Sequence, residues 1–379
     1  MSNIGFHRST HSDRLERWLG TPGVEAISAA MRDWYGPPIA LGDVHGAVWA
    51  DAGGDFHGRI NGGQFLSATE WAWNWVTRVA RRAARRQFGV ANAGFTSLSD
   101  LISEATQGNK SLNLYWEKVE TSGTAGVWFS LWGIGPHPTA GANAAAAPGG
   151  EAPTQATIGA PAMADCSPDF RFIVTAMVLD SGINSPWLCY DRLFQVDKTM
   201  NSTANESVTG VPTRYQSSTP ADWDYAGGNF MFPEVGGTAL ANTAHNWGVA
   251  GGNECLYRNQ AGTDSQTLPV VTGNANAAVR RLDNPGEQWF MPLASGDTGV
   301  MDLARMRCSA AVATGVINFV IGHPLAWAVQ PVAYAAGLTD NINTAFNLTR
   351  VFDGAALAWL RRKVGGATTP TMAVHLVAG

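Results

Sequence analysis

Short apolar runs separated by turn residues fill residues 184–300, and this pattern constrains the fold more than any other feature. The runs have the length of β-strands, and the turns between them include Gly227-Gly228, Gly251-Gly252 and Asn284-Pro285-Gly286. Strands at this spacing, separated by such turns, are typical of all-β sandwiches and barrels. The sequence therefore predicts a mainly β fold, of the β-sandwich or jelly-roll type.

Strand-like runs continue on both sides of this stretch. We expect strands over residues 112–120, 126–132, 170–179, 185–196, 229–235, 254–259, 267–271, 288–293, 302–310, 316–322 and 371–377. Residues 350–364 fit either a strand or a helix. The predicted organisation is a helical N-terminal region or arm over residues 1–110, strands with an extended arm over residues 111–168, and a β-sandwich-like body over residues 169–379.

The extended arm is predicted from residues 133–161, which are rich in Gly, Ala and Pro and contain one charged residue, Glu151. This segment is too apolar for a solvated linker. Its Gly and Pro content also disfavours a helix. We therefore expect it to be extended and to lie along another surface.

Helix signals dominate the first hundred residues. The clearest helix spans residues 67–88, where Ser67 and Glu70 form a capping box ahead of an apolar face. We expect further helices over residues 12–19, after a cap at Thr21, and over residues 97–105. Short β-like pieces at residues 47–49 and 56–60 interrupt this region.

The helix over residues 67–88 also carries the candidate interface residues. They are Trp71, Trp75, Arg78, Arg82, Arg85 and Arg86. Trp and Arg are typical of buried interface anchors, and Arg also neutralises phosphates in nucleic-acid complexes. We expect this helix to contact a neighbouring subunit, with a solvated face or a nucleic-acid contact as alternatives.

Composition supports a protein that buries much of its surface against neighbours. Charged residues make up only 15% of the chain, whereas it contains 43 Gly and 15 Trp. A surface poor in charge and rich in aromatic residues suits interfaces, although a soluble enzyme with a loop-rich β fold is an alternative. The net charge of −5 argues against general nucleic-acid binding.

The four cysteines, Cys166, Cys189, Cys255 and Cys308, are too widely spaced for a zinc site or a dense disulfide framework. We expect them to be buried free thiols. The N-terminal residues lack an apolar signal region, and no run reaches 18 apolar residues. Secretion and membrane spanning are therefore not expected.

Two short motifs suggest metal chemistry. Gly42-Asp43-Val44-His45-Gly46 matches the opening motif of metallophosphoesterases, and Asp55-Phe56-His57-Gly58 nearly repeats it. Such enzymes need further ligand motifs downstream, which this sequence lacks, so we expect two turns and neither a metal nor a cofactor. The common motifs for nucleophilic, nucleotide-binding and zinc-protease sites are also missing, whereas paired carboxylates of a glycosidase would need no local spacing.

The tryptophans offer a different possibility, because aromatic side chains could line a carbohydrate site. The candidates are Trp71, Trp73, Trp75, Trp128, Trp132, Trp187, Trp223, Trp247, Trp289 and Trp327. They are scattered along alternating strand-like runs. This distribution favours core and interface packing over a carbohydrate site.

Four segments resemble the structural proteins of tailed-bacteriophage virions. They are LCYDRLFQV (residues 188–196), VPTRYQSS (211–218), YRNQAGT (257–263) and MPLASGDTGV (291–300). In that group a strand reading LYDRL precedes a P-x-RY turn, a YTNQxG hairpin and a PLxxGDTGV edge. Further segments, including MRDWYGPPI and SLWGIGPHPTAG, extend the resemblance over most of the chain.

The resemblance implies a component of a phage head or other virion shell, made in the host bacterial cytoplasm and active only once assembled. Its partners would be further copies of itself and other capsid subunits, with a possible contact between Arg78–Arg86 and packaged DNA. The α+β fold of tailed-phage major capsid proteins is an alternative to the β-sandwich. Alternative functions are a tail or fibre component that binds host glycans, and a metallophosphoesterase-like hydrolase.

Overall fold

The computed structural model describes residues 98–379 together with three strands of the preceding region. Within 98–379, the segments 107–109, 121–125, 183–184, 220–223, 285–287, 342–348 and 364–366 are not described. The chain divides into two compact units, Met1–Phe88 and Gly89–Gly379.

The described part of the first unit is an antiparallel sheet of β1 (Gly46–Ala50), β2 (Phe56–Ile60) and β3 (Gln64–Ser67). Strands β1 and β2 confirm the β-like pieces predicted at residues 47–49 and 56–60. The helices predicted over residues 12–19 and after Thr21 lie outside the described residues, and so does the helix predicted over 67–88 except for its cap residue Ser67, which ends β3. In the second unit, helix α4 (Leu98–Thr106) confirms the short helix predicted over residues 97–105.

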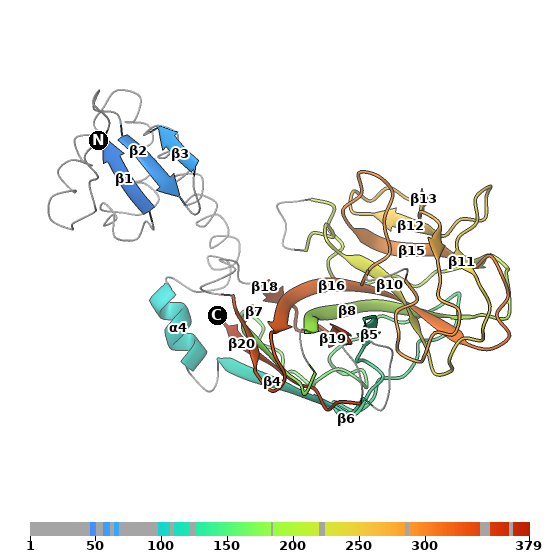
Figure 1. Ribbon diagram of the computed structural model, residues 1–379, viewed down its shortest axis with the longest axis horizontal. Coiled ribbons are helices and arrows are strands. Elements are labelled where there is room, and N and C mark those ends of the chain that lie inside the picture. The colour runs from blue at the N-terminus through green and yellow to red at the C-terminus, as the bar shows by residue number, and fades with distance from the viewer. Residues whose placement is uncertain are drawn as a thin grey trace. The chain divides into compact units, whose positions relative to one another are not determined.

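Two long strands form the centre of the second unit. Strands β8 (Ser185–Thr199) and β16 (Val316–Gln330) each have 15 residues and pair antiparallel along their whole length (Figure 1). Strand β10 (Phe230–Val235) pairs with the other edge of β16. Strand β19 (Leu357–Arg362) pairs with the other edge of β8, and β5 (Trp128–Ser130) follows it.

Residues 280–283 link the two outer strands of this sheet. The Ser130 amide donates to the Arg280 carbonyl (2.9 Å), and the Val235 amide donates to the Arg281 carbonyl (2.9 Å). One side of the segment therefore bonds β5 and the other bonds β10. The sheet closes into a small barrel, which leaves these strands no free edge.

A second sheet packs against one half of the barrel. Its order is β17 (Gly337–Asp340), β7 (Arg171–Leu179), β20 (Thr371–Ala378), β4 (Ser111–Lys118) and β6 (Pro136–His137), with β18 (Thr349–Val351) also paired to β7. Trp116, Val178 and Met372 of this sheet share one core with Trp187 and Trp359 of the barrel. Helix α4 covers part of the other face, where Leu101 meets Phe172 and Val174.

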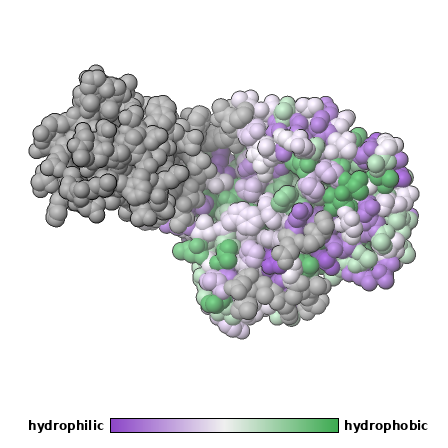
Figure 2. All heavy atoms as spheres, turned by 45° about the horizontal axis from the view of Figure 1, so that its top comes forward, coloured by the Kyte–Doolittle hydropathy of each residue, from purple (hydrophilic) through white to green (hydrophobic). Residues whose placement is uncertain are grey.

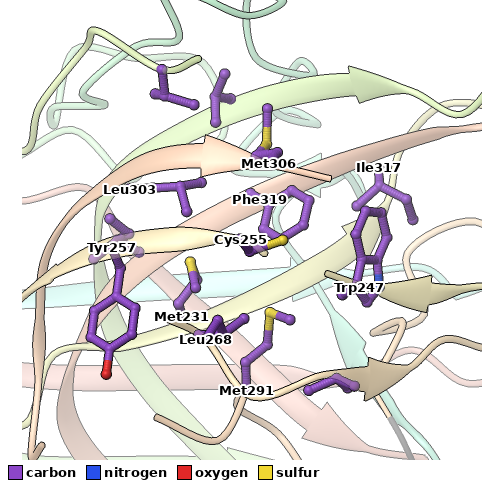
Figure 3. Packing of buried hydrophobic residues seen from close by; sticks show 14 of the residues in the cluster. Met231, Trp247, Cys255, Tyr257, Leu268, Met291, Leu303, Met306, Ile317 and Phe319 are labelled. Carbon is purple, nitrogen blue, oxygen red and sulfur yellow. The ribbon is translucent and has the colours of Figure 1, made fainter. Parts of the chain in front are cut away.

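Smaller strands cover the other half of the barrel. They are β9 (Glu206–Ser207), β12 (Leu256–Asn259), β13 (Gln266–Thr267) and β15 (Val300–Met306), with β11 (Asn246–Trp247) paired to β14 (Val271–Thr272). Figure 3 shows the core between them and the barrel, where Trp247, Tyr257 and Leu303 meet Ile317 and Phe319 of β16.

Side-chain alternation explains why β8 reads as a nearly continuous apolar run. Trp187 and Cys189 face the second sheet, whereas Leu188 and Tyr190 belong to the cluster inside the barrel. Successive side chains of a strand point to opposite faces, so a strand buried on both faces is apolar at almost every position. The same reasoning applies to β16, and the two strands therefore connect the cores.

The prediction of a mainly β chain is confirmed, with differences in detail. Residues 350–364 form strands β18 and β19 rather than a helix. Residues 288–293 form no strand, and the Met291 amide instead bonds the Met231 carbonyl (2.7 Å) beside β10. Strand β16 continues past its predicted end at residue 322, because an irregularity in its pairing at Pro324 accommodates the missing amide proton.

The Gly-, Ala- and Pro-rich arm is extended, and the surface that it follows belongs to the same chain. The Ala147 amide donates to the Asp197 carbonyl (3.1 Å), and Glu151 pairs with Gln195 of β8. The arm thus continues the pairing of β8 beyond the end of β19. It is a strap on the barrel within one subunit.

Candidate functional site: buried charge pairs and an exposed apolar strip

A fully buried ion pair lies inside one end of the barrel. Arg192 of β8 donates to both carboxylate oxygens of Glu234 on β10, at 3.2 and 3.1 Å. Burial by itself would raise the pKa of Glu234, but the charge and hydrogen bonds of Arg192, together with the charge of Arg280, outweigh burial and the pKa is lowered. Both groups are therefore charged, and bidentate geometry makes this a strong pair.

Two further side chains complete the polar end of the barrel. The Asn318 amide is oriented with its nitrogen toward Asp197 (3.1 Å) and its oxygen toward Arg192 (2.6 Å). Burial, together with the negative charge of Glu234, raises the pKa of Asp197 to about 7. Asp197 is therefore partly protonated near neutral pH, which limits the net charge enclosed by the barrel.

A second buried pair joins two of the segments that resemble virion proteins. Asp191 of LCYDRLFQV accepts two hydrogen bonds from Arg214 of VPTRYQSS, at 2.8 and 2.7 Å. Asp191 also accepts from the Ala356 amide (2.9 Å) just before β19. The carboxylate therefore fixes the 211–218 loop against the barrel.

The residue after Arg214 extends this attachment. The Tyr215 ring stacks on the His323 ring at 3.7 Å with an interplanar angle of 5°. Burial lowers the pKa of His323 to about 3, so the imidazole is neutral and donates from Nδ1 to the Asn229 side chain (2.6 Å). Asn229 in turn donates to the Tyr215 carbonyl (3.0 Å). The ring stack and the two hydrogen bonds thus link Tyr215, His323 and Asn229 in a cycle of uncharged groups.

The other two resembling segments also bond each other. Asn259 donates to Asp297 (2.8 Å), and Tyr257 donates to the other oxygen of Asp297 (2.5 Å). Gln260 accepts from the Thr298 and Gly299 amides at 2.9 and 3.1 Å. The YRNQAGT turn and the GDTGV edge are thus held together by side chains that the two motifs specify.

A third charge cluster lies beside the core between the barrel and the second sheet. Arg361 of β19 pairs with Asp180 (2.8 Å), and Lys363 pairs with Glu120 (2.9 Å). The Arg361 guanidinium also lies over the Trp187 ring at 4.7 Å. All four charged side chains are buried, so the cluster depends on its members being paired.

The thiols are protonated and poorly suited to nucleophilic chemistry. Cys189, Cys255 and Cys308 are buried and free, as predicted, whereas Cys166 is half-buried. Burial, followed by its hydrogen bond to Asp353, raises the pKa of the Cys166 thiol to about 12. Within the described parts of the chain, no group of three His, Cys, Asp or Glu side chains is placed to hold a metal ion.

Several candidates from the sequence lie outside the described residues. These are the interface candidates Trp71, Trp75, Arg78, Arg82, Arg85 and Arg86, and the metal candidates Asp43, His45 and Asp55. His57 lies on β2.

The described tryptophans fall into two groups. Trp132, Trp187 and Trp247 are buried. Trp327 contacts Trp289 edge-to-face (5.2 Å) and Trp128 in the same way (6.1 Å). Trp327 remains 40% exposed and Phe290, which contacts Trp289, 36%. These four side chains, of which Trp128 is buried, form the aromatic rim.

An apolar row crosses the outer face of the second sheet. The pairing places Leu338 of β17 beside Met177, Met177 beside Ala373, and Ala373 beside Tyr115 of β4. Leu338 is 65% exposed and Tyr115 44%. The row lies opposite the sheet's buried face, because Leu114 and Trp116 on either side of Tyr115 point into the core.

Four further exposed apolar residues lie near the ends of these strands but outside the row. Val119 follows β4, and Val329, Val332 and Tyr334 lie at the end of β16 and in the turn before β17. We call the row from Leu338 through Met177 and Ala373 to Tyr115 the apolar strip. The sequence gives no sign of this row, because the outward positions of β4 include Asn113 and Glu117 and β17 is too short to show a pattern. On the face of the second unit that Figure 2 shows, the hydrophobic residues (green) lie in separate groups.

Comparisons with known proteins give little further information. No family model and no curated protein matches the chain. One solved chain, from a structure of the infectious bursal disease virus Gt strain, shares 8% identity at a TM-score of 0.15, with 77% of this chain and 86% of that chain covered. A likeness at this score carries no argument about fold or function. Among the described residues, no helix has the length and apolar character needed to cross a membrane.

Proposed function

We propose that the protein is a non-enzymatic structural component of a bacteriophage virion, which forms or cements the capsid shell through contacts between subunits. It would be made in the host bacterial cytoplasm and act in the assembled virion, bound to copies of itself and to other capsid subunits. One observation carries this proposal. The polar side chains that are most distinctive of the four virion-like segments form hydrogen bonds and ion pairs with one another.

The Asp191–Arg214 pair joins the first two segments, and Asp297 joins the last two through Tyr257 and Asn259. Side chains used in this way maintain a rigid body and do not converge on a substrate. Rigidity is what a shell subunit requires, since contacts repeated by symmetry must keep one geometry. The buried pair Arg192–Glu234 stiffens the barrel further.

The finer features of the proposal follow from the same resemblance. The body would be of the β-sandwich or jelly-roll type, which the face-to-face packing of barrel and second sheet supports. The residues Trp71, Trp75, Arg78, Arg82, Arg85 and Arg86 would form a helical contact with a neighbouring subunit or packaged DNA. The α+β fold of major capsid proteins is the alternative.

Electron microscopy and light scattering of the purified full chain test the proposal. We expect particles or defined oligomers by negative stain once the other virion proteins are added, with this chain present in the particles by mass spectrometry. A chain that stays monomeric and never enters a particle would contradict the proposal.

The aromatic rim supports a second candidate, a tail or fibre component that binds host glycans. Trp327 and Phe290 expose ring surface while Trp289 and Trp128 hold them in place. A glycan array with the full chain tests this function. Binding that is lost in Trp327→Ala and retained in Tyr334→Ala, an exposed aromatic that is not part of the rim, would favour it over the shell component.

A further inference from the structure

We propose that two copies of this chain bind each other through the open edge of β4, as a pair of antiparallel strands that joins their second sheets into one. The open edge is the side of residues 111–115 that faces away from β20. This inference deepens the proposed function and rests on it for its biological role, because a shell needs contacts between copies.

The backbone of β4 is bonded to β20 at alternate residues. The Ala378 amide donates to the Lys110 carbonyl (2.8 Å), and the Lys118 amide donates to the Pro370 carbonyl (3.0 Å). In an antiparallel pair such bonds recur at every second residue. The even-numbered residues of β4 therefore bond β20, and the odd-numbered residues point their N–H and C=O groups away from it.

These outward groups are occupied only at the C-terminal end of β4. Strand β6 pairs with the strand there, and the Val119 amide donates to the Gly135 carbonyl (2.7 Å). Among the residues that the structure describes, none bonds the outward N–H and C=O groups of Ser111, Asn113 and Tyr115. They form an open edge to which another strand can add by backbone hydrogen bonds.

The residues of this edge fit a second copy of the same strand. Pairing centred on Asn113 places Asn113 opposite its own copy and Ser111 opposite Tyr115, so that every outward group meets a partner group. The stretch Ser111–Trp116 contains no charged residue, so a twofold axis brings no like charges together. The stretch also lacks the Lys, Pro and bulges that commonly protect exposed edges from such pairing.

The length of the open edge matches this pairing. A turn at Lys110 precedes β4, and β6 begins to pair with it at Glu117. A second copy that runs antiparallel along residues 111–115 reaches its own turn before it meets β6. The edge is therefore bounded at both ends in the way that a twofold strand pair requires.

The outer face of the sheet gives a second indication. Helix α4 packs over Val377, whose pairing partner on β4 is Ser111. Cross-strand neighbours lie side by side on one face, so the partner's Tyr115 would follow Ser111 in the same row, beside α4. Tyr115 is 44% exposed in a single copy. The row that α4 covers in one copy would thus continue into the apolar strip of the other.

Sedimentation velocity of the full chain over a range of concentrations tests the inference. Asn113→Pro removes the outward amide at the centre of the pair and leaves the bonds to β20 in place, and Pro is tolerated at edge positions of this kind. The matched control is Asn113→Thr, which changes the same side chain but keeps the amide. We expect the dimer dissociation constant to rise roughly tenfold or more for Asn113→Pro, because both central hydrogen bonds are lost, and to change by less than about twofold for Asn113→Thr.

Hydrogen exchange at single-residue resolution gives a readout that needs no variant. The Ser111, Asn113 and Tyr115 amides of the wild type should be protected at high concentration and exchange freely on dilution. The Leu112 and Leu114 amides should be protected at both concentrations, because they bond β20. Protection of the outward amides would identify the β4 edge even if Asn113→Pro failed to fold.

Three outcomes would overturn the inference without deciding the proposed function. They are a wild type that stays monomeric over the whole concentration range, a dimer that Asn113→Pro leaves unchanged, and outward amides that exchange freely in the dimer. Entry of the wild type into particles, measured separately by mass spectrometry, decides whether the chain is a virion component.

Discussion

The Arg192–Glu234 pair can be tested by removing each partner in turn. Glu234→Leu leaves the buried Arg192 guanidinium without its carboxylate, and Arg192→Met leaves the buried Glu234 carboxylate without its guanidinium. Breaking a buried pair in this way costs about 3–5 kcal/mol, whereas replacing both partners with apolar residues often costs much less. We expect each single variant to lower the free energy of unfolding by that amount and the double variant to recover part of it, measured by urea denaturation.

The control for this cycle is the exposed pair between Arg258 and Asp264, whose side chains are 45% and 78% exposed. Arg258→Met should change stability by less than about 1 kcal/mol, because water screens the pair. Equal effects of Arg258→Met and Arg192→Met would show that burial of the barrel pair has no energetic consequence.

His245 makes stability depend on pH. Its Nε2 faces Asp283 (2.8 Å) and its Nδ1 faces the Thr243 carbonyl (3.0 Å), and both partners only accept. The ring must therefore donate from both nitrogens, which requires the charged form. Burial alone would lower the pKa of His245, but the hydrogen bond and charge of Asp283 raise it above its usual value of 6.5.

The sign of the effect follows from this raised pKa. The stabilisation is fully present below about pH 6.5, the pKa of an unfolded histidine, and is lost as the pH rises through the folded pKa. We expect His245→Gln to lower the melting temperature markedly at pH 5.5 and less at pH 9. Groups that titrate in both proteins affect both melting temperatures, so their contributions cancel in the difference between wild type and variant. If that difference did not change with pH, His245 would not be charged in the folded protein.

At the scale of elements, the contact between β17 and β16 depends on Gly337. A Cβ at this position would lie 2.3 Å from the Val329 carbonyl oxygen and 2.7 Å from its carbon, both backbone atoms. Backbone cannot move aside as a flexible side chain can, so Gly337→Ala should destabilise the protein by about 1–3 kcal/mol. Chemical denaturation measures this change.

Gly149 in the strap provides the matched substitution, because a Cβ there would meet nothing within 4 Å. Gly149→Ala should be neutral or slightly stabilising, since it only restricts the unfolded chain. If the two alanine variants were equally stable, β17 would not be held against β16 in the way described.

Strands with a clear alternation of apolar side chains could be predicted from the sequence. Segments whose structure depends on hydrogen bonds to distant strands could not. Strands β7, β8 and β20 were predictable because their side chains alternate between two buried faces or between core and solvent. The second half of β16 was not, because Gly322 and Pro324 mimic a turn. Closure of the barrel depends on hydrogen bonds of residues 280–283, which leave no pattern in their side chains.

The same limit applies to the candidate site. The acidic and basic residues of the motifs were visible in the sequence, but their pairing was not, because Arg192 and Glu234 are 42 residues apart and Asp191 and Arg214 are 23 apart. The aromatic rim likewise joins Trp128, Trp289 and Trp327 from distant segments. Contacts of this kind follow from topology, which one sequence does not specify.

At the scale of the whole second unit, β8 and β16 connect the outer cores and the barrel interior. Ile317 and Phe319 of β16 belong to the core with β12 and β15, whereas Leu325 and Ala328 of the same strand belong to the core with the second sheet. One half of such a strand cannot lose its partners without exposing apolar side chains of the other half. The cores should therefore unfold together.

Two substitutions test this coupling, one in each outer core. Leu303→Ala removes buried volume beside β12, and Met372→Ala does so between the second sheet and the barrel. Each should cost about 2–5 kcal/mol. Hydrogen exchange followed by mass spectrometry should show either variant accelerating exchange in both halves of residues 98–379 to the same extent. Acceleration confined to the half that carries the substitution would mean that β8 and β16 join two independent folding units.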